Sequence, residues 1–71
     1  MSVATSLALA LVRVPPDAAR PSPEQFRRAL DDDRRALGLP PGDPDNELIV
    51  TGPERVMIGA HRFDEYTVWE R

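Results

Sequence analysis

The amino-acid sequence predicts a small α+β fold, a two-layer sandwich in which one amphipathic helix packs on a largely antiparallel sheet. Residues 22–38 carry the start signal, the apolar period and the stop signal of a helix. Residues 47–71 are rich in strand-forming residues and contain short glycine turns, as in an antiparallel meander. A length of 71 residues allows a single domain, so we expect the order strand, helix, strand, strand, strand around one core.

The first element, within residues 1–14, is predicted as a strand because larger and smaller side chains alternate along it. We expect the larger set to face the core and the smaller set to form a close-packed back face. The larger set is Val3, Thr5, Leu7, Leu9 and Leu11, and the smaller set is Ala4, Ser6, Ala8, Ala10, Val12 and Val14. A helix is the alternative, since apolar residues from Val3 to Val14 also follow a helical stripe. The Val-Arg-Val ending before Pro15-Pro16 favours the strand.

Residues 15–21 are a proline-bounded linker, and the helix begins directly after it. Ser22 is the predicted N-cap, Pro23 takes the first helical position and Gln25 completes a capping box. The helix is expected to reach about Leu37, with Gly38 as its left-handed terminator.

One side of this helix is apolar. Phe26, Leu30 and Leu37 lie within about 40° of one another at about 100° per residue, so we expect all three in the core. Asp33 falls on the same side. We expect its carboxylate either to reach the rim of the core or to pair with a cation. The candidate cations are Arg13, His61 and Arg62.

Residues 47–71 are predicted to form three antiparallel strands after a turn-rich linker at residues 40–46. Leu48–Thr51 and Arg55–Ile58 are expected to pair as a hairpin around Gly52-Pro53. A second turn at Gly59-Ala60 leads into His61–Trp69, where we expect a bulge near Asp64-Glu65.

The composition narrows the possible chemistry. No cysteine is present and there is one histidine, which excludes disulfides and thiolate metal sites and leaves little for zinc. Nine basic residues, all arginines, stand against 12 acidic ones, and the net charge of −3 argues against general nucleic-acid binding. We predict no cofactor. A chain of this size without disulfide or metal is expected to gain stability from a partner.

The apolar run at the N-terminus is not predicted to target or cross a membrane. No basic residue precedes it, Arg13 interrupts it, and it is shorter than the roughly 20 residues that a bilayer requires. We therefore expect a cytoplasmic location and no membrane partner.

Two acidic clusters resemble metal sites without matching their geometry. Asp31, Asp32 and Asp33 would fan over about 200° on a helix, so they are expected to form surface ion pairs, with Asp31 four residues before Arg35. Asp43–Glu47 lacks the glycine of a calcium loop and is predicted to be a turn whose side chains bond their own backbone.

No catalytic residue is predicted, and we expect a protein that is not an enzyme. His61 with Asp64 and Glu65 is the only group suited to acid–base work, and no nucleophile accompanies it. A metal- or histidine-dependent activity is the third hypothesis.

The second hypothesis is a nucleic-acid-binding regulator. It would use the arginines of the helix and its linker, although Asp31 and Asp32 lie among them and reduce their field. These arginines are Arg20, Arg27, Arg28, Arg34 and Arg35.

The leading hypothesis is a protein–protein interaction module, a small adaptor, regulatory or assembly subunit that binds another protein or itself. Tyr66 and Val68 face one side of the last strand and Thr67 and Trp69 the other, so we expect an aromatic outside the core. We also expect this strand at a sheet edge, open to pairing. The interface candidates are Phe63, Tyr66, Val68, Trp69 and Arg71.

Overall fold

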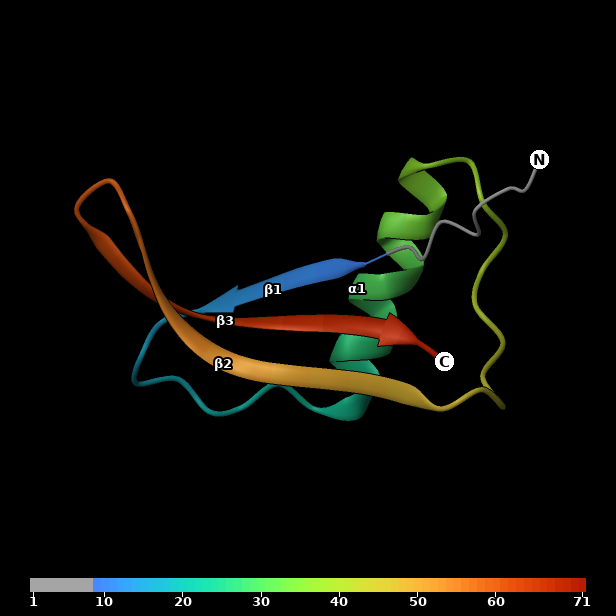
Figure 1. Ribbon diagram of the computed structural model, residues 1–71, viewed down its shortest axis with the longest axis horizontal. Coiled ribbons are helices and arrows are strands. Elements are labelled where there is room, and N and C mark those ends of the chain that lie inside the picture. The colour runs from blue at the N-terminus through green and yellow to red at the C-terminus, as the bar shows by residue number, and fades with distance from the viewer. Residues whose placement is uncertain (1–8) are drawn as a thin grey trace.

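The computed structural model describes residues 9–71. The chain forms strand β1 (Ala10–Val14), helix α1 (Pro23–Ala36), strand β2 (Leu48–Ile58) and strand β3 (His61–Glu70) (Figure 1). The three strands make one antiparallel sheet in the order β1-β3-β2. The α+β fold class is confirmed, and residues 9–71 contain three strands where four were expected.

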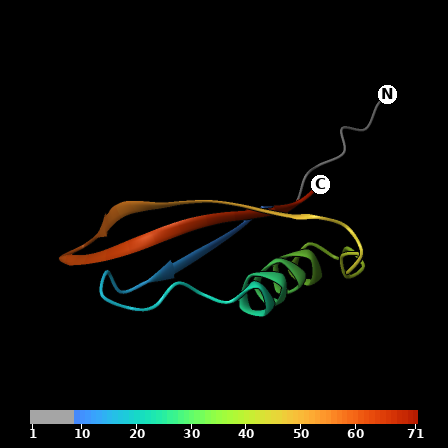
Figure 2. The ribbon, with the colours of Figure 1, turned by 90° about the horizontal axis from the view of Figure 1, so that it is seen from below.

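The helix and the sheet form two layers, and α1 covers one face of the sheet (Figure 2). The core between them is small: Ala10, Phe26, Leu30, Tyr66 and Val68 are buried, and partly buried apolar residues surround them. The surrounding residues are Val12, Val14, Ala29, Leu39, Leu48 and Val50.

Both ends of α1 are where the sequence places them. Ser22 Oγ accepts a hydrogen bond from the backbone N–H of Gln25 at 3.2 Å, and Gln25 Oε1 accepts one from the N–H of Ser22 at 2.8 Å. At the other end Gly38 has φ of 77°, and the N–H groups of Gly38 and Leu39 donate to the carbonyls of Arg35 and Arg34. This is a Schellman motif, which satisfies carbonyls that the helix leaves unpaired.

The prediction that Leu37 lies in the core is wrong. Leu37 is the C-cap of α1, after the last helical residue, and 62% of it is exposed. The Schellman turn redirects the chain there and packs Leu39 against the core instead.

The strand prediction is confirmed at Ala10–Val14, but its two faces are reversed. Ala10 is buried, and Val12 and Val14 pack against the core. Leu9 and Leu11 are 50% and 53% exposed, on the side away from α1. The rest of the predicted strand, Val3 to Ala8, lies outside the described residues.

Gly52-Pro53 is not a hairpin turn. β2 runs through it as one strand, in which the register changes from Thr51 opposite Thr67 to Glu54 opposite Glu65. Gly52 and Pro53 together therefore face Tyr66, and their peptide bond is cis. A bulge of this kind adds residues on one strand without ending the pairing. The expected bulge exists, but it is on β2 and not on β3.

The prediction that the last strand lies at a sheet edge is also wrong. β3 is the central strand and pairs with β1 on one side and β2 on the other. The turn at Gly59-Ala60 is confirmed, because it joins the paired residues Ile58 and His61. The sheet edges in the described part of the chain are β1 and β2.

Candidate interaction surface

The face of the sheet turned away from α1 carries apolar side chains, and we call it the open face. Tyr66 and Val68 are buried beneath the helix, so the alternation of a strand points Thr67 and Trp69 to the other side. The register places Leu11 beside Thr67 and Ile49 beside Trp69. In Figure 2 no other element of residues 9–71 lies over this side of the sheet. Its members near the helix end of the sheet are Leu9, Leu11, Ile49, Thr51, Thr67 and Trp69.

A charged row crosses the middle of the open face. Arg13 on β1, Glu65 on β3 and Glu54 on β2 lie in register across the three strands. Arg13 Nε donates to Glu65 Oε2 at 2.9 Å, with 43% of the arginine side chain and 17% of the glutamate side chain exposed. Glu54 lies opposite Glu65, so the row carries two carboxylates and one guanidinium.

Beyond the charged row, β2 and β3 continue as a two-stranded arm past the end of β1 (Figure 1). Val56 pairs with Phe63 and Ile58 with His61 on the side that continues the open face. Ile58 is 46% exposed near the tip on this side, whereas Met57, 59% exposed, lies on the opposite side of the arm. The arm therefore extends the apolar surface beyond the part of the sheet that the helix covers.

The structure divides the predicted interface residues into three groups. Tyr66 and Val68 belong to the core, so the prediction that they form an interface is wrong. Trp69 and Phe63 lie on the open face and are half-buried. Arg71 is exposed and pairs with Glu47 at 3.0 Å.

Sequence reasoning missed Leu9, Leu11 and Ile49 as surface residues. The sequence feature that indicates these surface residues is the presence of bulky apolar residues on both faces of the strands, as in the run Leu48-Ile49-Val50. A sheet covered by one helix buries only one of those faces.

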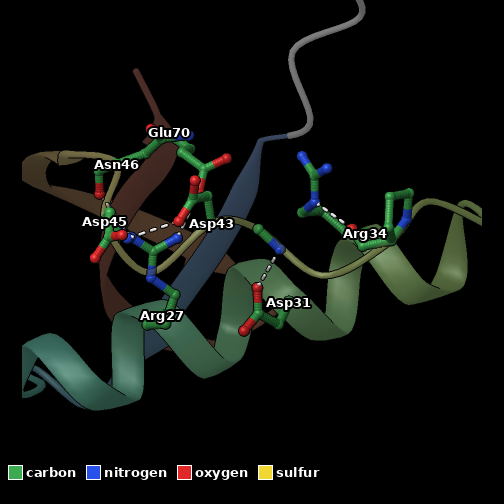
Figure 3. Close-up of polar contacts among 9 residues, drawn as sticks. Arg27, Asp31, Arg34, Asp43, Asp45, Asn46 and Glu70 are labelled. Atoms are coloured by element: carbon green, nitrogen blue, oxygen red, sulfur yellow. Dashed lines mark hydrogen bonds and ion pairs between the residues drawn. The ribbon is translucent and has the colours of Figure 1, made fainter.

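Three of the five arginines proposed to contact nucleic acid are engaged within the chain. The Arg20 guanidinium lies 5.6 Å from the ring centroid of Phe26 and 5.3 Å from that of Tyr66. Arg27 donates to Glu70 Oε2 at 2.8 Å and to the Asn46 carbonyl at 3.0 Å (Figure 3). Arg34 Nε donates to the Pro40 carbonyl at 2.7 Å.

Arg28 and Arg35 line a shallow groove along α1 together with Arg27 and Pro44. Glu24, Asp31 and Asp32 line the same groove, so its arginines are interleaved with carboxylates. This arrangement reduces the positive field that a phosphate backbone would meet.

The charged side of α1 holds the following loop to the helix. Asp31 Oδ1 accepts a hydrogen bond from the Gly42 N–H at 3.0 Å (Figure 3). The expected pair of Asp31 with Arg35 is not among the ion pairs of residues 9–71. Asp33 is half-buried, and Arg13, one of its expected partners, is paired with Glu65.

The other candidate chemical groups are separated. Asp64 pairs with Arg55 at 3.7 Å and Glu65 pairs with Arg13, so neither carboxylate is joined to His61. Asp43 Oδ1 accepts the N–H of Asp45 at 2.9 Å, which confirms the predicted turn. Among residues 9–71 no three His, Asp or Glu side chains gather into a group that would hold a metal ion.

Comparisons of the chain with protein-family models, with curated proteins and with solved structures find no match. Between residues 9 and 71, no helix has the length and apolar content needed to cross a bilayer.

Proposed function

We propose that this protein is a non-enzymatic interaction module that works in the cytoplasm and binds a protein through its open face. The observation that carries the proposal is the row of apolar side chains on a sheet face that α1 does not cover. Leu9 and Leu11 are about half exposed, Leu11 lies beside Thr67, and Ile49 lies beside Trp69 on the same face. Contiguous exposed apolar surface of this kind is typical of protein-binding sites.

The energetics support the same proposal. Removing apolar surface from water stabilises a complex by roughly 25 cal/mol per Å², and an aromatic anchor such as Trp69 contributes more than most residues. Arg13, Glu65 and Glu54 form the charged row. This row makes binding selective for partner and orientation, because the partner must present complementary charges opposite it.

Nucleic-acid binding receives less support. Arg20, Arg27 and Arg34 are engaged within the chain, and Arg28 and Arg35 share their groove with three carboxylates. An enzymatic role is less well supported within residues 9–71, since Asp64 and Glu65, the carboxylates that would assist His61, are paired with Arg55 and Arg13.

The test is a matched pair of leucine substitutions. Leu11→Glu places a charge in the open face, and Leu37→Glu places the same charge at the C-cap of α1, where the leucine is 62% exposed. The mass of each purified chain is measured by sedimentation, and the proteins that each immobilised chain retains from a lysate of its source are recorded. We expect Leu11→Glu to abolish self-association or specific retention and Leu37→Glu to preserve it.

The proposal is overturned if wild type and Leu11→Glu behave alike in both measurements while circular dichroism shows that both are folded. Loss of binding in Leu37→Glu alone would also overturn it, because that residue lies off the open face.

A further inference from the structure

We propose that the occupant of the open face is a second copy of this chain, docked face to face about a two-fold axis that runs nearly along β3. This inference rests on the proposed function and names its partner. The charged row selects among possible partners and orientations, because charges on two docked surfaces must be complementary.

The two ends of the charged row are complementary to each other. Glu65 lies at its centre, with Arg13 on one edge strand and Glu54 on the other. A two-fold axis along the central strand lays β1 of one copy over β2 of the other. Each Arg13 then faces the partner's Glu54, and this contact occurs twice. The two Glu65 carboxylates meet at the axis, each paired with its own Arg13 at 2.9 Å. A two-fold axis across the strands through the same row would also oppose the two Glu65 side chains and would in addition place Arg13 against the partner's Arg13, so the axis along β3 is favoured.

The intramolecular contacts leave room for this pairing. Arg13 bonds Glu65 through Nε, so its terminal nitrogens take no part in that bond, and 43% of the side chain is exposed. Glu54 is exposed and lies opposite Glu65 on the neighbouring strand, and directly opposed like charges destabilise a sheet. The partner's Arg13 would lie opposite Glu54 and would relieve this repulsion between Glu54 and Glu65.

The apolar rows agree with the same axis. Trp69 lies on the central strand, so it would face the partner's Trp69, with Ile49 of one copy near the end of the partner's β1. Leu11 would lie over the partner's Thr51 in the next row. Stacked sheets lie about 10 Å apart with their strands inclined by about 30°, which leaves space for these side chains to interdigitate.

The size of the face sets the expected affinity. Three strands about 4.8 Å apart span roughly 14 Å, and the five residues of β1 at about 3.3 Å each limit the three-stranded face to a length of roughly 17 Å. This is below the size of a standard specific interface, so we expect a weak dimer with a dissociation constant on the order of 10–100 μM.

The experiment is sedimentation equilibrium between about 5 and 200 μM, a range chosen to span this affinity. We expect a reversible monomer–dimer equilibrium for the wild type. Glu54→Arg should weaken the dimer at least about tenfold, because it places an arginine against the partner's Arg13 at two symmetric positions. The double substitution Arg13→Glu with Glu54→Arg restores the pairing in the opposite sense and should recover most of that loss.

Asp32→Arg is the control, since it makes the same charge change on the exposed side of α1 and should leave the dimer unchanged. A monomeric wild type throughout the range overturns the inference, as does a double variant no tighter than Glu54→Arg. If the wild type is monomeric while Leu11→Glu still abolishes retention of a different protein, the second copy is excluded and the proposed function stands.

Discussion

The ring of Phe26 meets the ring of Tyr66 edge to face, with centroids 5.3 Å apart and planes inclined by 64°. Phe26 comes from α1 and Tyr66 from the central strand, so this contact joins the two layers. The guanidinium of Arg20 lies over both rings, 5.6 and 5.3 Å from their centroids. The linker before the helix thus closes one side of the core with an arginine.

Replacing Arg20 by alanine should lower the free energy of unfolding by about 0.5–1 kcal/mol, the range for cation–π contacts at exposed sites. Arg62→Ala is the matched control, because Arg62 is exposed and lies on the arm, away from the core. Urea denaturation at fixed salt measures both variants. Equal stability of Arg20→Ala and wild type would show that the two ring contacts contribute nothing.

Leu30 is fully buried at 0% exposure, so Leu30→Ala should cost roughly 2–5 kcal/mol through lost burial and the cavity left behind. Leu37→Ala should change the unfolding free energy by less than about 0.5 kcal/mol, because that side chain is mostly in water. Thermal and urea unfolding of the two variants provide the comparison. A cost at Leu37 equal to that at Leu30 would contradict the placement of the helix end.

Gly52 should be the least replaceable glycine of the sheet. It has φ of 110°, and a Cβ there would lie 2.7 Å from the backbone carbonyl oxygen of Glu65. Gly52→Ala should therefore cost about 2–3 kcal/mol in unfolding free energy. Gly59→Ala should cost about 1 kcal/mol, since its φ is also positive but nothing lies within 4 Å of the added Cβ. Similar losses at the two positions would contradict the close approach of Gly52 to β3.

Duplex DNA and RNA should not be retained by the protein at physiological ionic strength. The groove arginines Arg28 and Arg35 share their surface with Glu24, Asp31 and Asp32, and the chain carries a net charge of −3. Fluorescence anisotropy with labelled duplexes checks this expectation. Micromolar binding that weakens steeply with salt and is lost in the Arg28→Ala, Arg35→Ala variant would instead support the nucleic-acid hypothesis.

The elements that the sequence predicts correctly are those whose signals are local. Ser22, Gln25 and Gly38 mark the helix ends through contacts with residues three or four positions away, and the structure contains those contacts. The strand character of Ala10–Val14 likewise follows from its own residue types.

The predictions that are wrong concern features decided by contacts between distant segments of the chain. The side of β1 that faces the core is decided by where α1 packs, and small Ala10 is the residue buried there. Gly52-Pro53 has the composition of a turn, yet pairing with β3 carries the strand through it as a bulge. The alternation of β3 predicts one aromatic outside the core, but whether that residue is Tyr66 or Trp69 depends on which face α1 covers, and α1 covers Tyr66.

The position of β3 in the sheet also bears on the order in which the sheet forms. The hairpin of β2 and β3 closes over the two residues Gly59 and Ala60, which is a microsecond event in isolated hairpins, on the order of 1–10 μs. β1 reaches β3 only by closing a far longer loop, since Arg13 and Glu65 are 52 positions apart. We therefore expect the hairpin to act as the template on which the first strand docks late. In the transition state for folding, the β2–β3 hairpin would then be formed and β1 not yet docked. Substitutions in the arm should therefore change the folding rate, and substitutions in β1 should change the unfolding rate.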